Sequence, residues 1–240
     1  IELMREAGKR LAHVHQELEA MIAPGISTWE IDAKGEKLIR DCGCIPNFLH
    51  YNGYPASICV SVNDEVVHGI PRKDRYLKEG DIVSLDAGLI YKGYHSDAAR
   101  THAVGKVSTE AQKLMDVTKQ SFFEGIKMAK EGQHLHDISR AIEEYVTPYG
   151  YGIVRDLVGH GIGTALHEDP QIPNYAQKRR GVRLQAGMTL AIEPMINAGT
   201  WQVRFLRDGW TVVTKDGSLS AHYENTILVT DGEPEILTLY

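Results

Sequence analysis

Apolar residues near the start of the chain recur at spacings of three and four residues. This pattern is formed by Leu3, Ala7, Leu11, Val14, Leu18 and Met21. It predicts an amphipathic helix that ends before Pro24-Gly25, a pair that does not continue a helix. Ser27 and Glu30 have the spacing of a capping box, so a second helix is expected to begin there.

Similar patterns occur further along the chain. Thr109 and Gln112 also have capping-box spacing, and they precede a long helix that is expected to reach about Lys130. Another helix is expected over residues 135–146. The segment Ile58–Gly69 predicts two strands separated by a turn at Asn63-Asp64.

The two halves of the sequence resemble each other at a shift of 107 residues. Residues 24–31 align with residues 131–138, and Leu77–Asp86 aligns with Leu184–Glu193. Each match is short, but the matches run in the same order along the chain. Two copies are too few for a solenoid, so the repeat indicates one pseudo-symmetric domain.

We therefore expect residues 1–240 to form a single domain, with halves at approximately 1–107 and 108–240. Each half has helices followed by strands, and no Pro/Ser-rich linker separates the two. The expected fold class is α+β, with helices packed on the outer face of a curved antiparallel sheet.

Several apolar, strand-like runs carry a carboxylate where charge is unfavourable. Asp86 and Glu193 each follow such a run directly, and Glu224 shortly precedes another. A hairpin that turns around residues 91 and 92 would place Asp86 directly opposite Asp97, with Cβ atoms roughly 4.5–5.5 Å apart. Buried carboxylates destabilise a fold unless a cation or hydrogen bonds compensate them. The pattern therefore indicates bound cations.

Composition narrows the classes of function. Hydrophobic residues make up 42% of the chain and charged residues 24%, as in ordinary globular proteins. The net charge is −6, and the one dense basic run, Lys178-Arg179-Arg180, is interpreted as a solvated loop, so no nucleic-acid partner is expected. No apolar run reaches the roughly 20 residues of a membrane helix, so no membrane partner is expected.

The three cysteines are interpreted as reduced thiols, which favours a cytoplasmic location.

The chain begins at Ile1 rather than at a methionine, so a few native N-terminal residues are expected to be missing. A monomer is the expected oligomeric state.

One imidazole joins the carboxylates as a candidate ligand. His160 lies in the segment Gly159–Gly163, where glycines allow close approach of the backbone to a crowded site. An oxygen-rich ligand set with one nitrogen suits Mn²⁺, Fe²⁺, Co²⁺ or Zn²⁺. Two such ions about 3.5–4 Å apart can share carboxylates and activate water as a nucleophile. The predicted set is Asp86, Asp97, His160, Glu193 and Glu224.

Two further histidines are candidates for catalysis. His68 and His167 each lie in a His-x-x-Pro segment, one in each half of the chain. Such imidazoles can donate hydrogen bonds to a developing oxyanion or to a departing nitrogen. The alternative interpretation of either residue is a hydrogen-bonded surface histidine.

Together these residues resemble the type I methionine aminopeptidases. The resemblance rests on Asp86, Asp97, Gly-His160-Gly-Ile-Gly, Ile-Glu193-Pro, Tyr-Glu224-Asn-Thr, Ile58–Asn63 and His68-Gly-Ile-Pro. It covers essentially the whole chain and implies the pita-bread fold, whose two halves are pseudo-symmetric. The implied activity removes the initiator methionine from nascent polypeptides through attack of a di-metal-activated hydroxide on the first peptide bond. A small second residue is preferred.

The resemblance also implies a role for each ligand. Asp86 would bind one metal, Asp97 and Glu224 would bridge both, and His160 and Glu193 would complete the shell of the other. Glu193 would also carry the proton during catalysis.

Other roles follow from the same resemblance. His167 would stabilise the tetrahedral intermediate, and His68 would lie near the scissile amide nitrogen. The methionine pocket would be lined by Cys59, Tyr54, Trp210, Leu166, Tyr51 and Phe48, together with the two histidines. Asn63 and a carbonyl near Ser220 would bind a monovalent cation. The implied partners are the N-termini of nascent polypeptides, met at the ribosome.

Two alternative functions remain open from the sequence. An Xaa-Pro aminopeptidase or prolidase shares the implied fold and metal ligands but usually carries an additional N-terminal domain. A non-catalytic binding protein of the same fold tends to lose metal ligands, and here all five are present. No zinc-finger extension precedes Ile1 and no long insertion separates His167 from Glu193, which favours a type I enzyme from a bacterial source.

Overall fold

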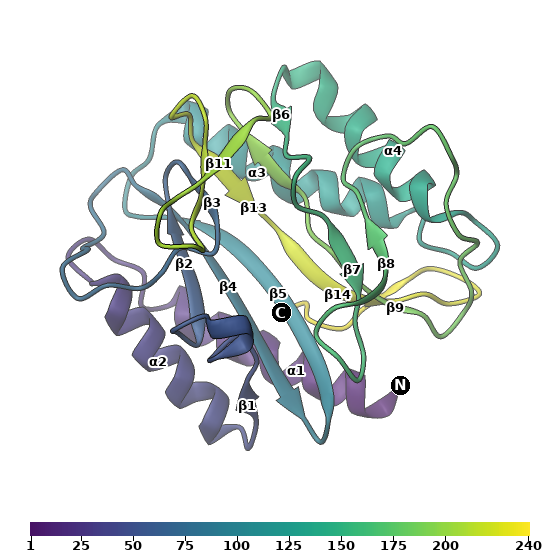
Figure 1. The fold of residues 1–240 in the computed structure, drawn as a ribbon, viewed down its shortest axis with the longest axis horizontal. Coiled ribbons are helices and arrows are strands. Elements are labelled where there is room, and N and C mark those ends of the chain that lie inside the picture. Colours follow the sequence, from purple (N-terminus) through teal and green to yellow (C-terminus); the bar gives the residue numbers. More distant parts are fainter.

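The structure is a computed structural model that describes residues 1–240. Its four α-helices form two pairs, one in each half of the chain (Figure 1). The first pair is α1 (Glu2–Glu19) and α2 (Thr28–Asp41), and the second is α3 (Thr109–Ile126) and α4 (Leu135–Val146). Single 3₁₀ turns form η1 (Tyr51–Gly53) and η2 (Thr147–Tyr149). Both helix pairs recur at the shift of 107 residues that relates the two halves of the sequence.

The helix starts follow the capping signals, with one correction. At α2, Ser27 Oγ accepts the N–H of Glu30 and the Glu30 carboxylate accepts the N–H of Ser27, as predicted. At α3 the cap is Ser108, not Thr109: Ser108 Oγ accepts the N–H of Ala111 at 3.1 Å. The Gln112 amide instead donates along the helix to Asp116, so the predicted box does not form. Helix α3 also ends four residues before Lys130, which pairs in a short bridge with Thr230.

One antiparallel sheet of nine strands runs through both halves. Its order is β1-β4-β5-β14-β9-β7-β8, with β2 paired to β4 and β15 paired to β14. The halves join where β5 pairs with β14, so the sheet is continuous across the molecule (Figure 1). The strands of this sheet are β1 (Ile45–Pro46), β2 (Ile58–Val62), β4 (Ile82–Tyr91), β5 (Tyr94–Ala103), β7 (Gly159–Gly161), β8 (Glu168–Ile172), β9 (Thr189–Ile192), β14 (Glu224–Leu228) and β15 (Glu235–Ile236).

Two small sheets complete the architecture. One has the order β13-β10-β6, formed by Ser220–His222, Met195–Asn197 and Gly152–Ile153. The other has the order β11-β12-β3, formed by Val203–Phe205, Val212–Thr214 and Glu65–Val67. The two strands predicted in Ile58–Gly69 are therefore present, but they pair in different sheets: β2 with β4, and β3 with β12.

The register of the β4–β5 hairpin corrects a prediction about Asp86 and Asp97. Tyr91 pairs with Tyr94, so the turn consists of Lys92 and Gly93, whose φ angles are 49° and 83°. Asp86 then lies opposite Ala99, and Asp97 lies opposite Gly88. The two aspartates are diagonal neighbours on one face, not directly opposed partners. Asp86 also lies in the middle of its ten-residue strand and not at its end.

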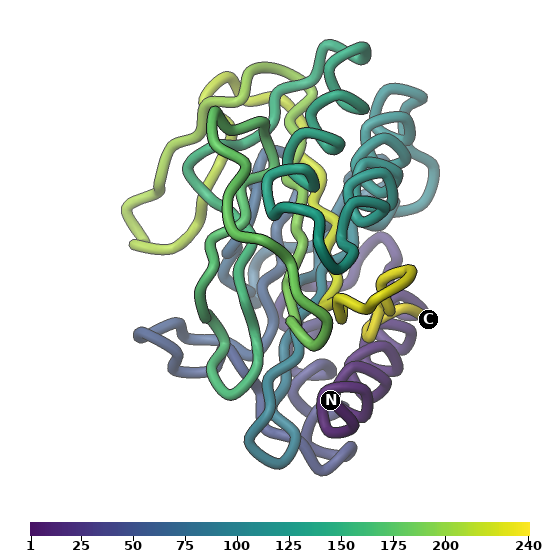
Figure 2. The backbone as a smooth tube through the Cα atoms, turned by 90° about the vertical axis from the view of Figure 1, so that its right-hand side faces the viewer, coloured from purple at the N-terminus to yellow at the C-terminus, as the bar shows by residue number.

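The helices cover one face of the main sheet. In the side view, α1 (purple) and α3 (teal) lie on the same side, and the yellow-green segment around β11 protrudes on the other (Figure 2). Each half has its own hydrophobic core, and Leu11 in α1 and Phe122 in α3 are fully buried in these two cores. The α+β class with outer helices is confirmed.

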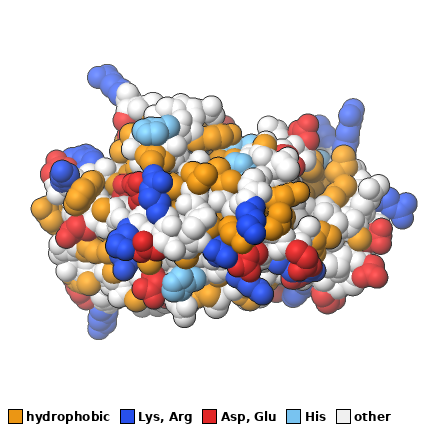
Figure 3. Space-filling model, turned by 90° about the horizontal axis from the view of Figure 1, so that it is seen from below, with side chains coloured by type: hydrophobic (Ala, Val, Ile, Leu, Met, Phe, Trp, Pro, Cys, Tyr) orange, Lys and Arg blue, Asp and Glu red, His pale blue; other side chains and the backbone are white.

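The surface agrees with the mixed charge pattern of the sequence. On the face seen in Figure 3, acidic and basic side chains are interspersed and form no continuous basic stripe. None of the helices combines the length and the hydropathy that crossing a membrane requires.

Candidate metal centre and active site

Five neighbouring strands bring the predicted ligands together. Asp86 lies on β4, Asp97 on β5, Glu224 at the start of β14, Glu193 directly after β9, and His160 on β7. The strand order β4-β5-β14-β9-β7 places these five elements side by side in the main sheet. Residues far apart in the sequence therefore converge at the centre of the molecule.

Small residues between the ligands make this convergence possible. Ala99 of β5 pairs with Asp86 on one side and with Glu224 on the other. His160 pairs with Ala191 of β9. The glycines beside His160 are required by close packing: a Cβ on Gly159 would lie 2.4 Å from the Ala191 carbonyl oxygen.

The distances between the side chains suit a shared metal ion. His160 Nε2 lies 3.6 Å from Glu193 Oε1 and 4.0 Å from Asp97 Oδ2. These separations are long for hydrogen bonds, but they are no longer than two metal–ligand bonds of about 2.0–2.2 Å each, so one ion can reach both atoms of a pair. His160 Nδ1 lies 2.8 Å from the Gly161 carbonyl oxygen, which fixes the proton on Nδ1 and leaves Nε2 free to bind a metal.

Unsatisfied buried oxygens support the same assignment. Asp86 Oδ1, Asp97 Oδ1 and Glu224 Oε1 are inaccessible to solvent and have no hydrogen-bond partner. Buried polar atoms normally have partners. The ligating atoms of Asp97, His160 and Glu224 lie within 4.8 Å of one another, so a divalent cation fits this donor set.

The protonation states reflect the same crowding. Burial raises the pKa of Asp86 to about 7, partly offset by a hydrogen bond with Asp97. Burial, followed by the charge of Glu224, raises the pKa of Asp97 well above its usual value. Burial also raises the pKa of Glu193 and of Glu224, and it lowers the pKa of His160 to about 4. Without a cation the cluster therefore holds protons, and a divalent ion replaces them.

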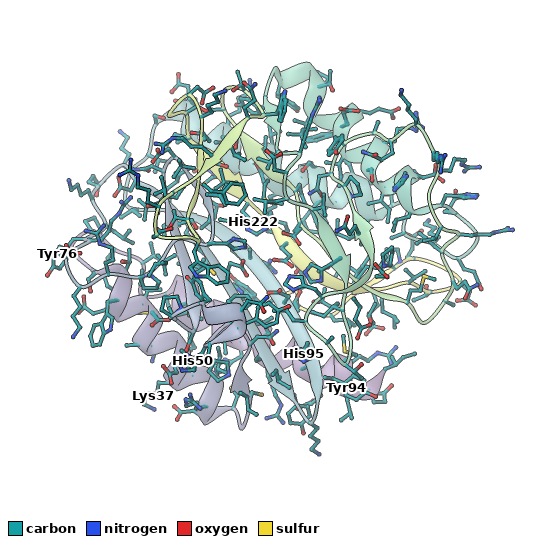
Figure 4. The ribbon with its side chains drawn as sticks, in the orientation of Figure 1. Lys37, His50, Tyr76, Tyr94, His95 and His222 are labelled. Atoms are coloured by element: carbon teal, nitrogen blue, oxygen red, sulfur yellow. The ribbon has the colours of Figure 1, made fainter.

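His222 also belongs to this cluster, and sequence reasoning did not identify it as a site residue. Its Nε2 lies 3.7 Å from Glu193 Oε2 and 3.9 Å from Glu224 Oε2, and neither ring nitrogen has a hydrogen-bond partner. It lies near the centre of the molecule, whereas Tyr94 and His95 lie toward the far end of the β4–β5 hairpin (Figure 4). The available signal was the alternation in His222-Tyr-Glu224, which puts His222 and Glu224 on one face.

A cavity of about 220 Å³ opens onto the carboxylate cluster. Its walls contain all five predicted ligands, both candidate histidines and every predicted pocket residue, namely Phe48, Tyr51, Tyr54, Cys59, Leu166 and Trp210. Asn52 also lines it and was not predicted. Tyr54 donates to the Gly69 carbonyl at 2.8 Å and packs edge-on against Trp210, which gives this wall a fixed shape.

The two candidate histidines differ in their surroundings. His68 has a left-handed backbone conformation, with φ of 59°, and packs edge-on against Trp210. Burial, followed by the charge of His167, lowers the pKa of His68 to about 4. His167 is exposed on one side but crowded by protein on the other, which lowers its pKa. Its ring lies 4.3 Å from that of His160, centroid to centroid, and Tyr51 Oη lies 2.8 Å from its Nδ1.

The residues proposed for a monovalent cation lie next to each other but outside this cavity. Ser220 donates its N–H to the Asn63 carbonyl at 2.9 Å. The Asn63 amide is engaged elsewhere: it donates to Asp81 Oδ1 and accepts the N–H of Ile82. The cation site therefore stays a prediction.

Comparison with known proteins agrees with this geometry. Residues 2–231 match the profile of metallopeptidase family M24. A methionine aminopeptidase of Clostridium acetobutylicum is 54% identical over 239 residues, which cover 100% of this chain and 96% of that protein. The crystal structure of a methionine aminopeptidase from Thermotoga maritima superimposes with a TM-score of 0.97 at 47% identity, covering 100% of this chain and 96% of that one.

A prolidase from Pyrococcus furiosus shares the fold more distantly. It superimposes with a TM-score of 0.78 at 22% identity, and the alignment covers 100% of this chain but 63% of the prolidase. The pita-bread fold expected from the sequence is therefore confirmed, with its two pseudo-symmetric halves. With a full-length family match and relatives above 50% identity, the chain belongs to metallopeptidase family M24 and, within it, to the methionine aminopeptidases.

Proposed function

We propose that this chain removes N-terminal methionine from newly made polypeptides. The observation that carries the proposal is one cavity with a buried carboxylate–imidazole cluster at one end and Cys59, Tyr54 and Trp210 in its walls. A volume of about 220 Å³ suits one side chain rather than a larger ligand. Aromatic and sulfur-containing walls favour a polarizable thioether.

The carboxylates and His160 would hold two divalent ions, of which Mn²⁺, Fe²⁺, Co²⁺ and Zn²⁺ are compatible with the donors. Such ions supply a nucleophile at neutral pH by lowering the pKa of water. We assign Asp97 and Glu224 as bridging ligands, Asp86 to one ion, and His160 with Glu193 to the other. This assignment agrees with the sheet order, because β5 and β14, which carry the bridging residues, are paired at its centre.

The remaining groups would act on the peptide. Glu193 would accept the proton of the attacking water and pass it to the departing amine. His167 would donate to the developing oxyanion, and His68 would lie near the scissile nitrogen. Both imidazoles are neutral at physiological pH because burial lowers the pKa of each, so each is able to donate one N–H without carrying charge.

Other parts of the proposal concern the setting of the enzyme. The enzyme would bind the N-termini of nascent chains at the ribosome, in the cytoplasm. It would be a monomer with one domain, whose halves are residues 1–107 and 108–240 approximately. Free cysteines agree with that compartment. A small second residue would be preferred, and Asn63 with the chain near Ser220 would bind a monovalent cation.

The competing functions have weaker support. Similarity to prolidases lies at 22% identity, against 54% for a methionine aminopeptidase, so an Xaa-Pro peptidase is not favoured. A non-catalytic binder is not favoured either, because all five ligand side chains line the cavity.

A peptide panel tests the proposed specificity. Metal-loaded protein would be incubated with Met-Ala-Ser, its N-acetylated form, and Ala-Pro-Ser, and the released amino acid identified. We expect free methionine from the first peptide alone. Release of alanine from Ala-Pro-Ser without release of methionine would favour the Xaa-Pro peptidase instead.

A further inference from the structure

A hydrogen bond across the cavity mouth links the two halves of the molecule. Tyr51 Oη and His167 Nδ1 are 2.8 Å apart, although the residues are 116 positions apart in the sequence. Their rings are tilted by 46°, with centroids 5.5 Å apart. Both residues line the cavity that holds the metal ligands. The Tyr51 hydroxyl is the sole hydrogen-bond partner of the His167 ring.

The loop that carries Tyr51 has an unusual backbone. His50 and Asn52, on either side of Tyr51, have left-handed φ angles of 66° and 48°. Non-glycine residues rarely adopt this conformation, and such strain gathers at functional sites. The turn is closed by the Tyr51 N–H on the Phe48 carbonyl and the Tyr54 N–H on the Tyr51 carbonyl, both at 2.9 Å. His50 marks where this turn begins, on the first half of the molecule (Figure 4). Tyr51 is therefore presented to His167 by a fixed turn.

The proton of His167 has two possible positions. A neutral imidazole carries one N–H, on Nδ1 or on Nε2, and the contact of Nδ1 with the Tyr51 hydroxyl is compatible with either. If the Tyr51 hydroxyl donates to Nδ1, the proton of the ring resides on Nε2. Nε2 is then the atom free to donate, and the ring cannot rotate without losing its partner.

We propose that Tyr51 is a positioning residue for His167: its hydroxyl holds the imidazole in the Nε2–H tautomer and in one orientation. The Nε2–H is then available to the carbonyl oxygen of the bond being cut. This rests on the role of His167 in the proposed function. Tyr51 lines the cavity and its hydroxyl orients His167, so two roles are combined in one residue.

Nitrogen-15 NMR tests the hydrogen bond without measuring turnover. Histidine-labelled, Zn²⁺-loaded protein would be studied at about pH 8, above the ordinary histidine pKa. The His167 signals are those missing in His167→Gln. We expect the proton on Nε2 and a hydrogen-bonded Nδ1, whose resonance moves toward the value of a free nitrogen in Tyr51→Phe. A proton on Nδ1, or unchanged signals in Tyr51→Phe, would overturn the proposal.

Tyr54→Phe is the matched control for this spectrum. It also removes a hydroxyl from the wall of the cavity, but that hydroxyl binds the Gly69 carbonyl rather than His167. We expect the His167 resonances to stay in place. An equal displacement in Tyr54→Phe would mean that they report repacking of the cavity, and the proposal would fail.

A double-mutant cycle connects the contact to turnover. Tyr51→Phe should lower kcat for Met-Ala-Ser roughly 3- to 10-fold with KM unchanged, the effect of one hydrogen bond between neutral groups. The same change in a His167→Ala background should have no further effect, because the group that Tyr51 orients is gone. Equal losses in both backgrounds would overturn the proposal.

The single variant His167→Ala separates this inference from the proposed function. It should lower kcat roughly 10²–10³-fold with metal retained, as for loss of one oxyanion donor. An unchanged kcat would mean that His167 has no part in the mechanism and that its contact with Tyr51 has no role in catalysis. The NMR experiment tests separately whether the hydrogen bond between Tyr51 and His167 exists.

Discussion

At the residue scale, Asp97 is the predicted ligand whose loss should affect the metal centre most. Its Oδ1 has no hydrogen-bond partner, and burial, followed by the charges of Glu224 and Asp86, raises its pKa. Asp97→Ala should therefore abolish tight metal binding and methionine release together. Metal content after dialysis and turnover of Met-Ala-Ser check this. Asp74→Ala, at an exposed aspartate paired with Arg72, is the control and should change neither. Retained metal with normal turnover in Asp97→Ala would remove Asp97 from the site.

His222 provides a second test at this scale. Its Nε2 lies 3.7 Å from a carboxylate oxygen of Glu193 and 3.9 Å from one of Glu224, so a small approach on metal binding would let its N–H orient a ligand. His222→Leu should weaken metal binding by roughly 10- to 100-fold, the usual effect of losing such a partner. His222→Gln keeps an N–H donor and should recover most of the affinity. Isothermal titration with Mn²⁺ measures both variants, and equal affinity in His222→Leu and the parent would contradict the assignment.

The candidate ligands were predicted from the sequence for a physical reason, and the structure brings them together in one cavity. Asp86, Glu193 and Glu224 lie beside apolar runs, and charge in such positions requires compensation. His222 gave only the weaker signal of its alternation with Glu224, and a buried histidine in a strand also occurs as ordinary core. Its place beside Glu193 depends on the pairing of β10 with β13, in which His222 lies opposite Met195, and local pattern does not reveal this long-range pairing.

At the element scale, the short strand β7 determines where His160 lies. It is confined between β8 and β9, and a Cβ on Gly161 would lie 2.3 Å from the Asp169 carbonyl oxygen. Gly161→Ala should therefore displace the strand, lower the free energy of unfolding by roughly 1–3 kcal/mol and weaken metal binding. Denaturant unfolding and metal titration measure the two effects.

Gly163→Ala is the control within the same motif. A Cβ there meets the Glu168 side chain at 3.1 Å, and a carboxylate on a flexible stem can move aside. Its effect should stay within about 0.5 kcal/mol, as for ordinary surface changes. If both alanine variants behave alike, the position of β7 is not set by close backbone packing.

Local sequence pattern was not sufficient to predict the register of the β4–β5 hairpin or the cap of α3. The hairpin register differs from the prediction because the turn is formed by Lys92 and Gly93, and Lys92 takes a left-handed conformation. A lysine in a sequence does not predict that conformation. The α3 cap differed by one residue because Ser108 and Thr109 are both good caps and the helix uses the first. The start of α2 was predicted from its capping box, and the range predicted for α4 matches the structure.

At the scale of the whole molecule, the metal centre couples binding to stability and pH. Burial raises the pKa of Asp86 to about 7, so the contribution of this carboxyl to the stability of the metal-free fold falls as pH rises from its unfolded value of about 4 to about 7. A cation removes this penalty and must displace protons below pH 7. His160 makes the opposite contribution between about pH 4 and its ordinary value of 6.5, because the unfolded imidazole binds a proton there that the folded one, with a pKa of about 4, does not.

Metal should therefore raise the melting temperature more at pH 8 than at pH 5.5. At pH 8, Mn²⁺ at 100 times its dissociation constant should add about 2.7 kcal/mol, or roughly 5–10 °C for a chain of this size. Thermal unfolding with and without Mn²⁺ at the two pH values measures the difference. A larger shift at pH 5.5 would contradict the buried-carboxylate account.

The internal repeat made the overall architecture predictable from the sequence. Helices at equivalent positions in both halves anticipated the paired helices on one sheet. The joining of the halves through β5 and β14, and the contact of Tyr51 with His167, had no local signal, because both depend on residues more than 100 positions apart.

Metal-dependent methionine release tests the central claim most directly. Metal-stripped protein would be given Met-Ala-Ser, and Mn²⁺, Fe²⁺, Co²⁺ or Zn²⁺ would be restored one at a time while free methionine is measured. We predict no release without metal and clear release with at least one of the four ions. Folded protein that releases no methionine with any of them, or that releases it equally after metal removal, would contradict the account.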